Sequence, residues 1–491
     1  MTKKNATAAL GSFLGTLLLT QWVAAAGRPN IVFLFTDDQD VSSVGCYGND
    51  EVKTPHIDRI GMEGIRFDNH YVTTAICMAS RASVMTGLYE YRTGCNFDRG
   101  VLSEALWKQS YPMVLRKAGY RTAFAGKFGF EIGTSGERKG RLAETDFDLW
   151  GGGPGQTHFK TAKNPSIAHY AKEFPHASRA YGAFGRDFIQ GAAKDKAPFC
   201  LSISFKAPHR PVDPDPAFDD VYAGVRFTKP DNYGRAAGAH FSEQSRRGRQ
   251  YPRFEEWGYD NDYDAKLAKY YQLVYGVDQA VGMILDALDD TGVADNTVVI
   301  FTSDNGYFNG AHGYGSKVLP YEESARVPLL IRDPRKKTGG QVSDALTGSI
   351  DFASTILKLA GVKDPAKRDG VSLTPLLHNP AAEVRQQLSL INVWGPKETH
   401  SLSVVTRDWK YILWNAASAG MAPSEELYHT ATDPLELRNV AADPAAHGAL
   451  IEMQGRYDAA LAAWKRDAIH AAGYPDYATY FKRGTPWVMK K

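Results

Sequence analysis

Residues 31–38 read Ile-Val-Phe-Leu-Phe-Thr-Asp-Asp, an apolar run that ends in two carboxylates. Three later runs have the same form: residues 121–127 end in Gly-Lys, residues 199–209 in Lys-Ala-Pro-His, and residues 298–306 in Ser-Asp-Asn-Gly. Runs this apolar are typical of strands that are buried on both faces of a sheet. The four runs therefore predict the central strands of one sheet.

Stretches with helical patterning separate these runs, for example residues 113–117 and 270–288. Alternating strands and helices predict an α/β fold, with a mainly parallel sheet flanked by helices on both faces. Ligands of such sheets bind beyond the carboxyl ends of the strands. All four polar clusters lie at those ends, which indicates a functional site there.

The composition excludes several classes of protein. The chain has 491 residues, of which 43% are hydrophobic and 23% charged, as in globular proteins rather than disordered ones. Its 57 Lys and Arg against 55 Asp and Glu give a net charge of +2, and Lys3 and Lys4 account for that excess. A balanced chain argues against nucleic-acid binding. Four cysteines are too few for a disulfide scaffold.

The first 26 residues have the pattern of an export signal. Lys3 and Lys4 precede an uncharged stretch centred on residues 13–19, and Ala24-Ala25-Ala26 matches a cleavage site. A retained membrane anchor is the alternative, but the apolar block is short for a span. We expect cleavage after residue 26, no membrane span in the mature protein, and a periplasmic or secreted location.

Four oxygen-bearing side chains at two strand ends suggest a cation site: Asp37, Asp38, Asp304 and Asn305. Separately, the aspartates could cap a helix and the Asp-Asn-Gly sequence could form a turn. Together they match the oxygen ligands of calcium, whereas zinc would favour histidine or thiolate. The sequence therefore predicts one calcium ion per chain, with magnesium as the second choice.

Residues 77–81 read Cys-Met-Ala-Ser-Arg and are followed by Thr86-Gly87, the most specific motif in the chain. This segment resembles the signature of the formylglycine-dependent sulfatases, which belong to the alkaline phosphatase superfamily. The resemblance extends over nearly the whole mature chain. It includes these further motifs: Asp37-Asp38-Gln39, Gly126-Lys127, Pro208-His209, Ser303-Asp304-Asn305-Gly306, Gly315-Ser316-Lys317, Arg326-Val327-Pro328 and Asp369-Gly370.

The resemblance implies that Cys77 is oxidised to Cα-formylglycine by a separate modifying enzyme. One hydroxyl of the aldehyde hydrate would bind the metal and attack sulfur, and the other would later lose its proton as sulfate leaves. Cys77 begins a predicted helix, whose amino end favours an anion. Arg81 would hold the modified side chain in place. The alternative is a buried structural cysteine.

The same resemblance assigns Lys127 and Lys317 to the sulfate oxygens and His209 to the leaving oxygen. Positive groups aimed at developing charge are an effective catalytic device. His312 lies between Asp304 and Lys317 in the sequence, and it is either a second acid or substrate contact, or a turn residue.

The sequence departs from the family pattern at Gly129, where many relatives have a histidine two residues after the lysine. That histidine is thought to accept a proton from the second hydroxyl. The sequence offers other groups for this step without ranking them: His56, His70, Glu131 and His312.

A long irregular segment, residues 222–264, is rich in arginine and aromatic residues. Such segments are often functional, and guanidinium groups suit the anions of a sulfated sugar. Acidic residues are interleaved, so a solvated surface loop is the alternative. The predicted substrate contacts are Arg210, Arg246, Arg247 and Arg249.

A turn near Asn379-Pro380 predicts a boundary between a catalytic domain, residues 27–380, and a C-terminal subdomain, residues 381–491. Alternating patterns there predict a small antiparallel sheet, followed by a helix. The expected strands are residues 388–393, 401–406, 410–414 and 425–429, and the helix is 447–469.

Three functions compete at this point. The first is a sulfatase acting on a sulfated carbohydrate or polysaccharide. The second is a phosphodiesterase or phosphonate monoester hydrolase of the same superfamily. The third is a non-catalytic protein that binds sulfated glycans, suggested by the missing histidine. The intact Cys77, Arg81 and lysines argue against the third.

Overall fold

The computed structural model describes residues 27–336 and 338–488. The predicted export signal lies outside the described residues. Within them, no helix has both the length and the apolar character needed to cross a membrane.

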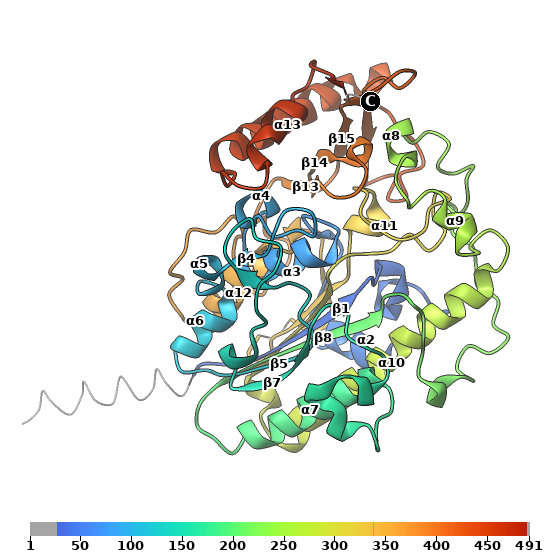
Figure 1. Ribbon diagram of the computed structural model, residues 1–491. Coiled ribbons are helices and arrows are strands. Elements are labelled where there is room, and N and C mark those ends of the chain that lie inside the picture. The colour runs from blue at the N-terminus through green and yellow to red at the C-terminus, as the bar shows by residue number, and fades with distance from the viewer. Residues whose placement is uncertain (1–26, 337, 489–491) are drawn as a thin grey trace, which may run out of the picture.

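An eight-stranded sheet lies at the centre of the larger part of the molecule (Figure 1). The four predicted strands are adjacent and parallel at its middle, in the order β9-β1-β8-β5, as the apolar runs predicted. The sheet continues through antiparallel β10 on one side and parallel β7 on the other. The strands in spatial order are β11 (Gln341–Ser343), β2 (Ile65–Phe67), β10 (Leu329–Arg332), β9 (Thr297–Ser303), β1 (Asn30–Asp37), β8 (Phe199–Pro208), β5 (Arg121–Lys127) and β7 (Leu149–Gly153).

No apolar run of the kind that predicts the central strands marks edge strand β7 in the sequence. It consists of Leu-Trp-Gly-Gly-Gly, which lacks the β-branched residues that usually mark a strand. Gly151 is needed for packing, because a Cβ there would lie 2.7 Å from the ring of Phe184. A bare backbone thus lets helix α7 (Ala177–Ala192), which carries Phe184, lie close to the sheet edge.

Alternate residues of β1 face opposite sides of the sheet, and each side is covered by helices (Figure 1). Phe33 packs into the core on one side, and Val32 into the core on the other. The first core includes α3 (Cys77–Thr86), α6 (Tyr111–Lys117) and α12 (Asp351–Leu359). The second includes α2 (Pro55–Met62), α7 (Ala177–Ala192) and α10 (Tyr263–Asp290).

A four-stranded antiparallel sheet forms the C-terminal part, and α13 packs on it (Figure 1). Each predicted strand is present with its ends shifted by no more than one residue. The elements are β13 (Leu388–Asn392), β14 (Ser401–Val405), β15 (Lys410–Trp414), β17 (Ser424–Tyr428) and α13 (His447–Asp467). The side chain of Lys410 is fully buried and pairs with Glu436 at 2.8 Å and with Glu322 at 2.6 Å. Glu322 precedes β10, so this triad joins the two sheets.

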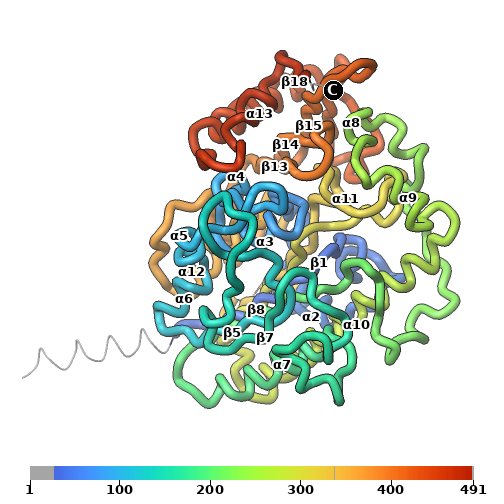
Figure 2. Tube along the Cα trace, in the orientation of Figure 1, coloured from blue at the N-terminus to red at the C-terminus, as the bar shows by residue number. Residues whose placement is uncertain are grey.

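The segment from residue 222 to 262 is mostly irregular, with short helices α8 (Glu243–Arg246) and α9 (Arg253–Glu256). Figure 2 places α8 beside the C-terminal sheet, although the two are far apart in the sequence. The Ser242 amide donates to Glu426 at 2.7 Å, and the Gln244 amide group donates to the Ala416 carbonyl at 2.9 Å. This segment therefore forms a wall between the two parts of the molecule.

Candidate active site

The carboxyl ends of neighbouring strands β1 and β9 bring the predicted oxygen ligands together. The Asp38 amide lies 3.3 Å from Asp304 Oδ1, and Asn305 Nδ2 donates to Asp38 Oδ1 at 2.6 Å. The side chains of all four predicted ligands are buried: Asp37, Asp38, Asp304 and Asn305. Parallel pairing of Thr36 with Ser303 explains the meeting, because it aligns the residues that follow each strand.

Cys77 meets these carboxylates from the first residue of α3. Its Sγ lies 3.5 Å from Asp37 Oδ1 and 3.0 Å from Lys317 Nζ. Ligand atoms of Asp37, Asp38, Cys77 and His209 all lie within 4.8 Å of one another. We call these four residues the Cys77 cluster.

The thiol of Cys77 is poorly suited to act as a nucleophile. Burial raises its pKa to about 11, and the negative charge of Asp37 adds to the effect. The thiolate is the reactive form of cysteine, so the side chain would be largely unreactive at neutral pH.

Cationic side chains surround the carboxylates. Lys127 contacts Asp37, and Lys317 contacts Asp38. Burial alone would raise the pKa of Asp37, but Lys127, followed by His209 and Lys317, holds it well below its usual range. Burial and the charge of Asp37 raise the pKa of Asp304 to about 6. The site therefore mixes buried charges of both signs.

Arg81 is fully buried and positioned by three contacts. Its Nε donates to Asp304 Oδ2 at 2.8 Å, Nη1 donates to the Lys127 carbonyl at 2.8 Å, and Nη1 also contacts Ser204. A Cβ on Gly129 would lie 2.3 Å from Arg81 Cδ. The arginine thus occupies the space that a side chain at position 129 would need, which accounts for the glycine in this chain.

The oxygen ligands fit a hard divalent cation. Asp37, Asp38 and Asp304 supply carboxylates, and Asn305 Oδ1 is a buried oxygen with no hydrogen-bond partner among the described residues. A buried acceptor left unpaired is costly unless another group binds it. Three carboxylates and an amide oxygen are ligands that calcium prefers.

The ring of His209 is positioned by its own loop. Its Nδ1 contacts the carbonyl oxygen of Arg210, which can accept a hydrogen bond from it. Its Nε2 lies 3.8 Å from Asp38 Oδ2. Burial lowers the pKa of His209 to about 4, so the ring is neutral at pH 7. With the proton on Nδ1, Nε2 presents a lone pair to the cluster.

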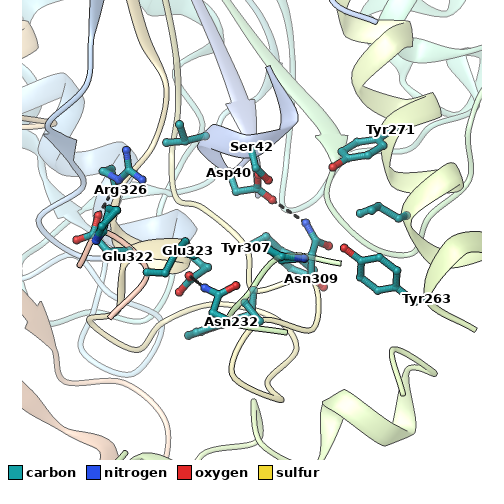
Figure 3. A pocket seen from close by; sticks show the side chains of 17 residues that line it. Asp40, Ser42, Asn232, Tyr263, Tyr271, Tyr307, Asn309, Glu322, Glu323 and Arg326 are labelled. Carbon is teal, nitrogen blue, oxygen red and sulfur yellow. Dashed lines mark hydrogen bonds and ion pairs between the residues drawn. The ribbon is translucent and has the colours of Figure 1, made fainter. Parts of the chain in front are cut away.

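His312 lies outside the Cys77 cluster. Its Nε2 is 3.3 Å from Asn232 Nδ2 and 3.6 Å from Glu323 Oε1, and its ring packs against Phe241. Although burial opposes it, the charge of Glu323 raises the pKa of His312. Figure 3 shows Asn232 and Glu323 lining a neighbouring pocket that contains none of the four cluster residues.

The other candidates for the missing histidine also lie elsewhere. His70 Nδ1 is 2.9 Å from Thr347 Oγ1, His56 packs against α10 at Gly282, and Glu131 accepts from the Gly140 amide. His209 is the only histidine of the Cys77 cluster among the described residues.

The four arginines predicted to contact substrate differ in their surroundings. Arg246 donates to the Ala239 carbonyl, and exposed Arg247 pairs with Glu243. Arg210 instead lies over the ring of Trp257 at 4.2 Å, and Arg249 over Trp394 at 3.9 Å.

Two further side chains were not among the predicted contacts. Arg253, in the same segment, donates to Ser316 Oγ at 3.1 Å, next to Lys317 in the sequence. Trp394 follows β13 in the C-terminal part, and its approach to Arg249 depends on tertiary packing that no local pattern indicates.

Known proteins are similar to this chain over most of its length. The family model described as Sulfatase matches residues 29–362, and a model for the C-terminal part of N-sulphoglucosamine sulphohydrolase matches residues 310–461. An N-acetylglucosamine-6-O-sulfatase of Bacteroides thetaiotaomicron is 30% identical over 84% of this chain and 82% of its own length. A human N-acetylglucosamine-6-sulfatase is 29% identical over 75% and 67% of the two chains. A solved structure in complex with its substrate, D-glucosamine-2-N,6-O-disulfate, superposes with a TM-score of 0.72 at 25% identity, covering 91% and 98%.

Proposed function

This chain belongs to the sulfatase family and hydrolyses sulfate esters, and we propose that its substrate is a sulfated carbohydrate cleaved at the Cys77 cluster. The observation that carries the site is the meeting of Cys77, two aspartates and His209 within 4.8 Å at the carboxyl ends of the sheet. The carbohydrate assignment is supported by the relatives, which are named for sulfated amino sugars.

The proposed nucleophile is Cα-formylglycine formed from Cys77 by a modifying enzyme. Its hydrate would supply the hydroxyl that an unreactive thiol cannot provide. The raised pKa of the Cys77 thiol supports this proposal, since the unmodified side chain would remain protonated. Arg81 would keep the modified side chain in place, as it is itself fixed by Asp304 and the Lys127 carbonyl.

The proposed metal ligands are Asp37, Asp38, Asp304, Asn305 and the modified side chain at position 77. When bound, calcium would supply positive charge next to the reacting sulfate. Lys127 and Lys317 would bind the sulfate oxygens from either side, and their placement before substrate arrives avoids a reorganisation cost during the reaction.

His209 is proposed to move both protons of the reaction. Its Nε2 presents a lone pair to the cluster, so it would take the proton that the attacking hydroxyl loses and pass it to the leaving alcohol. In the second half of the cycle it would take the proton of the remaining hydroxyl as sulfate leaves and release that proton to water. The absence of a side chain at Gly129 supports this double role, because none of the other histidines of the described residues joins the Cys77 cluster.

Rates on an aryl sulfate and an aryl phosphodiester test the reaction class at this site. We expect kcat/KM for the sulfate to exceed that for the diester by at least about a hundredfold, or roughly 3 kcal/mol in transition-state binding. A preference for the diester would favour the phosphodiesterase alternative.

A panel of defined sulfated saccharides tests the carbohydrate proposal. That proposal fails if the enzyme cleaves an aryl sulfate but none of the saccharides.

The proposed location is outside the cytoplasm, periplasmic or secreted, after removal of residues 1–26. The sequence of the first 26 residues supports it, because a basic start, an apolar stretch and a small-residue site follow in order. Sequencing the amino end of the mature protein tests the cleavage site.

The proposed boundary near residue 380 rests on the separate antiparallel sheet that begins at β13.

A further inference from the structure

Three arginines and two tryptophans gather beside the Cys77 cluster: Arg210, Arg249, Arg253, Trp257 and Trp394. We call them the arginine–tryptophan cluster. The guanidinium of Arg249 lies 3.9 Å from the ring centre of Trp394, and those of Arg210 and Arg253 lie 4.2 and 4.4 Å from Trp257. Stacking on aromatic rings fixes the guanidinium planes while leaving their N–H groups free to bind.

These three arginines have no acidic partner. In residues 27–336 and 338–488, no carboxylate oxygen lies within 4.0 Å of their guanidinium nitrogens, and Arg253 donates only to the hydroxyl of Ser316. Other arginines of the same segment are paired: Arg247 with Glu243 and Arg235 with Glu255. The cluster therefore concentrates positive charge that no ion pair within the described residues neutralises.

The positive charges act on one another and on the reacting centre. Partial burial lowers the pKa of Arg249 to about 10, and the charge of Arg253 contributes to the fall. Burial also lowers the pKa of Arg253, and the positive charge of Arg210 adds to this fall. Cys77 and Asp98 oppose the fall at Arg249, and Tyr307, Glu256 and Asp38 oppose it at Arg253. The influence of Cys77 and Asp38 places both arginines within electrostatic reach of the site. An anion bound between them would relieve their mutual repulsion.

We infer that the arginine–tryptophan cluster binds a second anionic group of the substrate, a sulfate or a carboxylate, next to the sulfate that is cleaved. The enzyme then prefers saccharides that carry at least two anionic groups. The reacting sulfate is already matched by Lys127 and Lys317, so three further cations beside it exceed what one sulfate needs. Guanidinium groups bind sulfate and carboxylate oxygens in pairs, which gives this recognition its geometry. The inference rests on the proposed carbohydrate substrate.

Three saccharides test the preference with the full-length enzyme. They are N-acetylglucosamine-6-O-sulfate, glucosamine-2-N,6-O-disulfate, and 6-O-sulfated N-acetylglucosamine linked to a uronic acid. We expect kcat/KM to be at least tenfold higher on one or both of the last two than on the first. The disulfate identifies a second sulfate as the ligand, and the uronic acid identifies a carboxylate. Equal rates on all three would overturn the inference while leaving the carbohydrate proposal intact.

Variants link the preference to the cluster. Arg249→Gln and Arg253→Gln should each reduce the ratio of kcat/KM values for the doubly and singly charged saccharides at least tenfold, mainly through KM. Arg226→Gln is the matched control, because Arg226 is an exposed arginine of the same segment with no contact to the cluster. An unchanged ratio in both cluster variants would overturn the assignment.

Two further results guard against misreading these assays. Thermal unfolding of each variant checks that the fold is retained, as expected for partly exposed side chains. Cleavage of an aryl sulfate with no cleavage of any saccharide would refute the carbohydrate proposal and this inference with it.

Discussion

Gly129 illustrates how one missing side chain shapes the site. A Cβ there would lie 2.3 Å from Arg81 Cδ, and the backbone φ of +85° is one that residues with side chains rarely adopt. We predict that Gly129→Ala displaces Arg81 from Asp304 and lowers kcat/KM on an aryl sulfate at least tenfold. Steady-state kinetics on the purified variant measure this.

Gly119→Ala is the control for backbone strain. Gly119 has a nearly equal φ of +89°, but no heavy atom lies within 4 Å of the added Cβ. Its cost should be limited to about 1 kcal/mol of stability with activity retained. Equal activity losses in the two variants would show that strain, rather than the clash with Arg81, causes the effect.

His209 is predicted to serve both halves of the reaction. If it only protonated the leaving group, His209→Ala would spare an aryl sulfate, whose leaving group needs little protonation. Because Nε2 also faces the nucleophile, we expect at least a hundredfold loss on both aryl and saccharide sulfates. His312→Gln should lose less than tenfold, since His312 contacts Asn232 and Glu323 instead. A loss confined to saccharides would refute the double role.

At the scale of elements, Asp278 joins α10 to the start of α2. Its Oδ1 accepts from the amides of His56 and Ile57, both at 2.8 Å. Burial raises the pKa of Asp278 to about 7, outweighing these amides. The folded state then holds a proton that the unfolded chain releases near pH 4, so stability should fall as pH rises from about 4 to 7.

The variant Asp278→Asn removes this titration and keeps an oxygen acceptor for the amides. We predict that the free energy of unfolding of the wild type, relative to the variant, falls by about 4 kcal/mol from pH 4 to 7 and is constant above. Urea unfolding at a series of pH values measures the difference. A difference that grows with pH would mean that the two amides, rather than burial, control the carboxyl.

The elements themselves were largely predictable from the sequence. The central strands were visible because strands buried on both faces must be apolar throughout, and Phe33 and Val32 do face different cores. Strand β7 was missed because its glycines serve close packing against Phe184, a tertiary requirement. The meeting of Asp37 with Asp304 followed from strand order, whereas the stacking of Arg249 on Trp394 brings together residues from different parts of the fold.

For the whole molecule, the proposed calcium site should couple ion binding to stability. A cation that binds only the folded state stabilises it by about 2.7 kcal/mol at a hundred times its dissociation constant. We predict that chelation lowers the thermal midpoint and abolishes activity, and that added calcium restores both. Asp304→Asn should remove the response to calcium, whereas exposed Asp290→Asn should retain it. Stoichiometric zinc in place of calcium would contradict the oxygen-ligand assignment.

The most direct test of the whole account is mass spectrometry of residue 77 in active enzyme, because the proposed chemistry depends on a modified Cys77. The peptide to analyse is residues 67–81, which trypsin releases after Arg66 and Arg81. We predict that the side chain has lost sulfur and two hydrogens and gained an oxygen, as an aldehyde requires, and that the modified fraction rises in proportion to specific activity. Full activity from protein with only the unmodified thiol at position 77 would contradict the account.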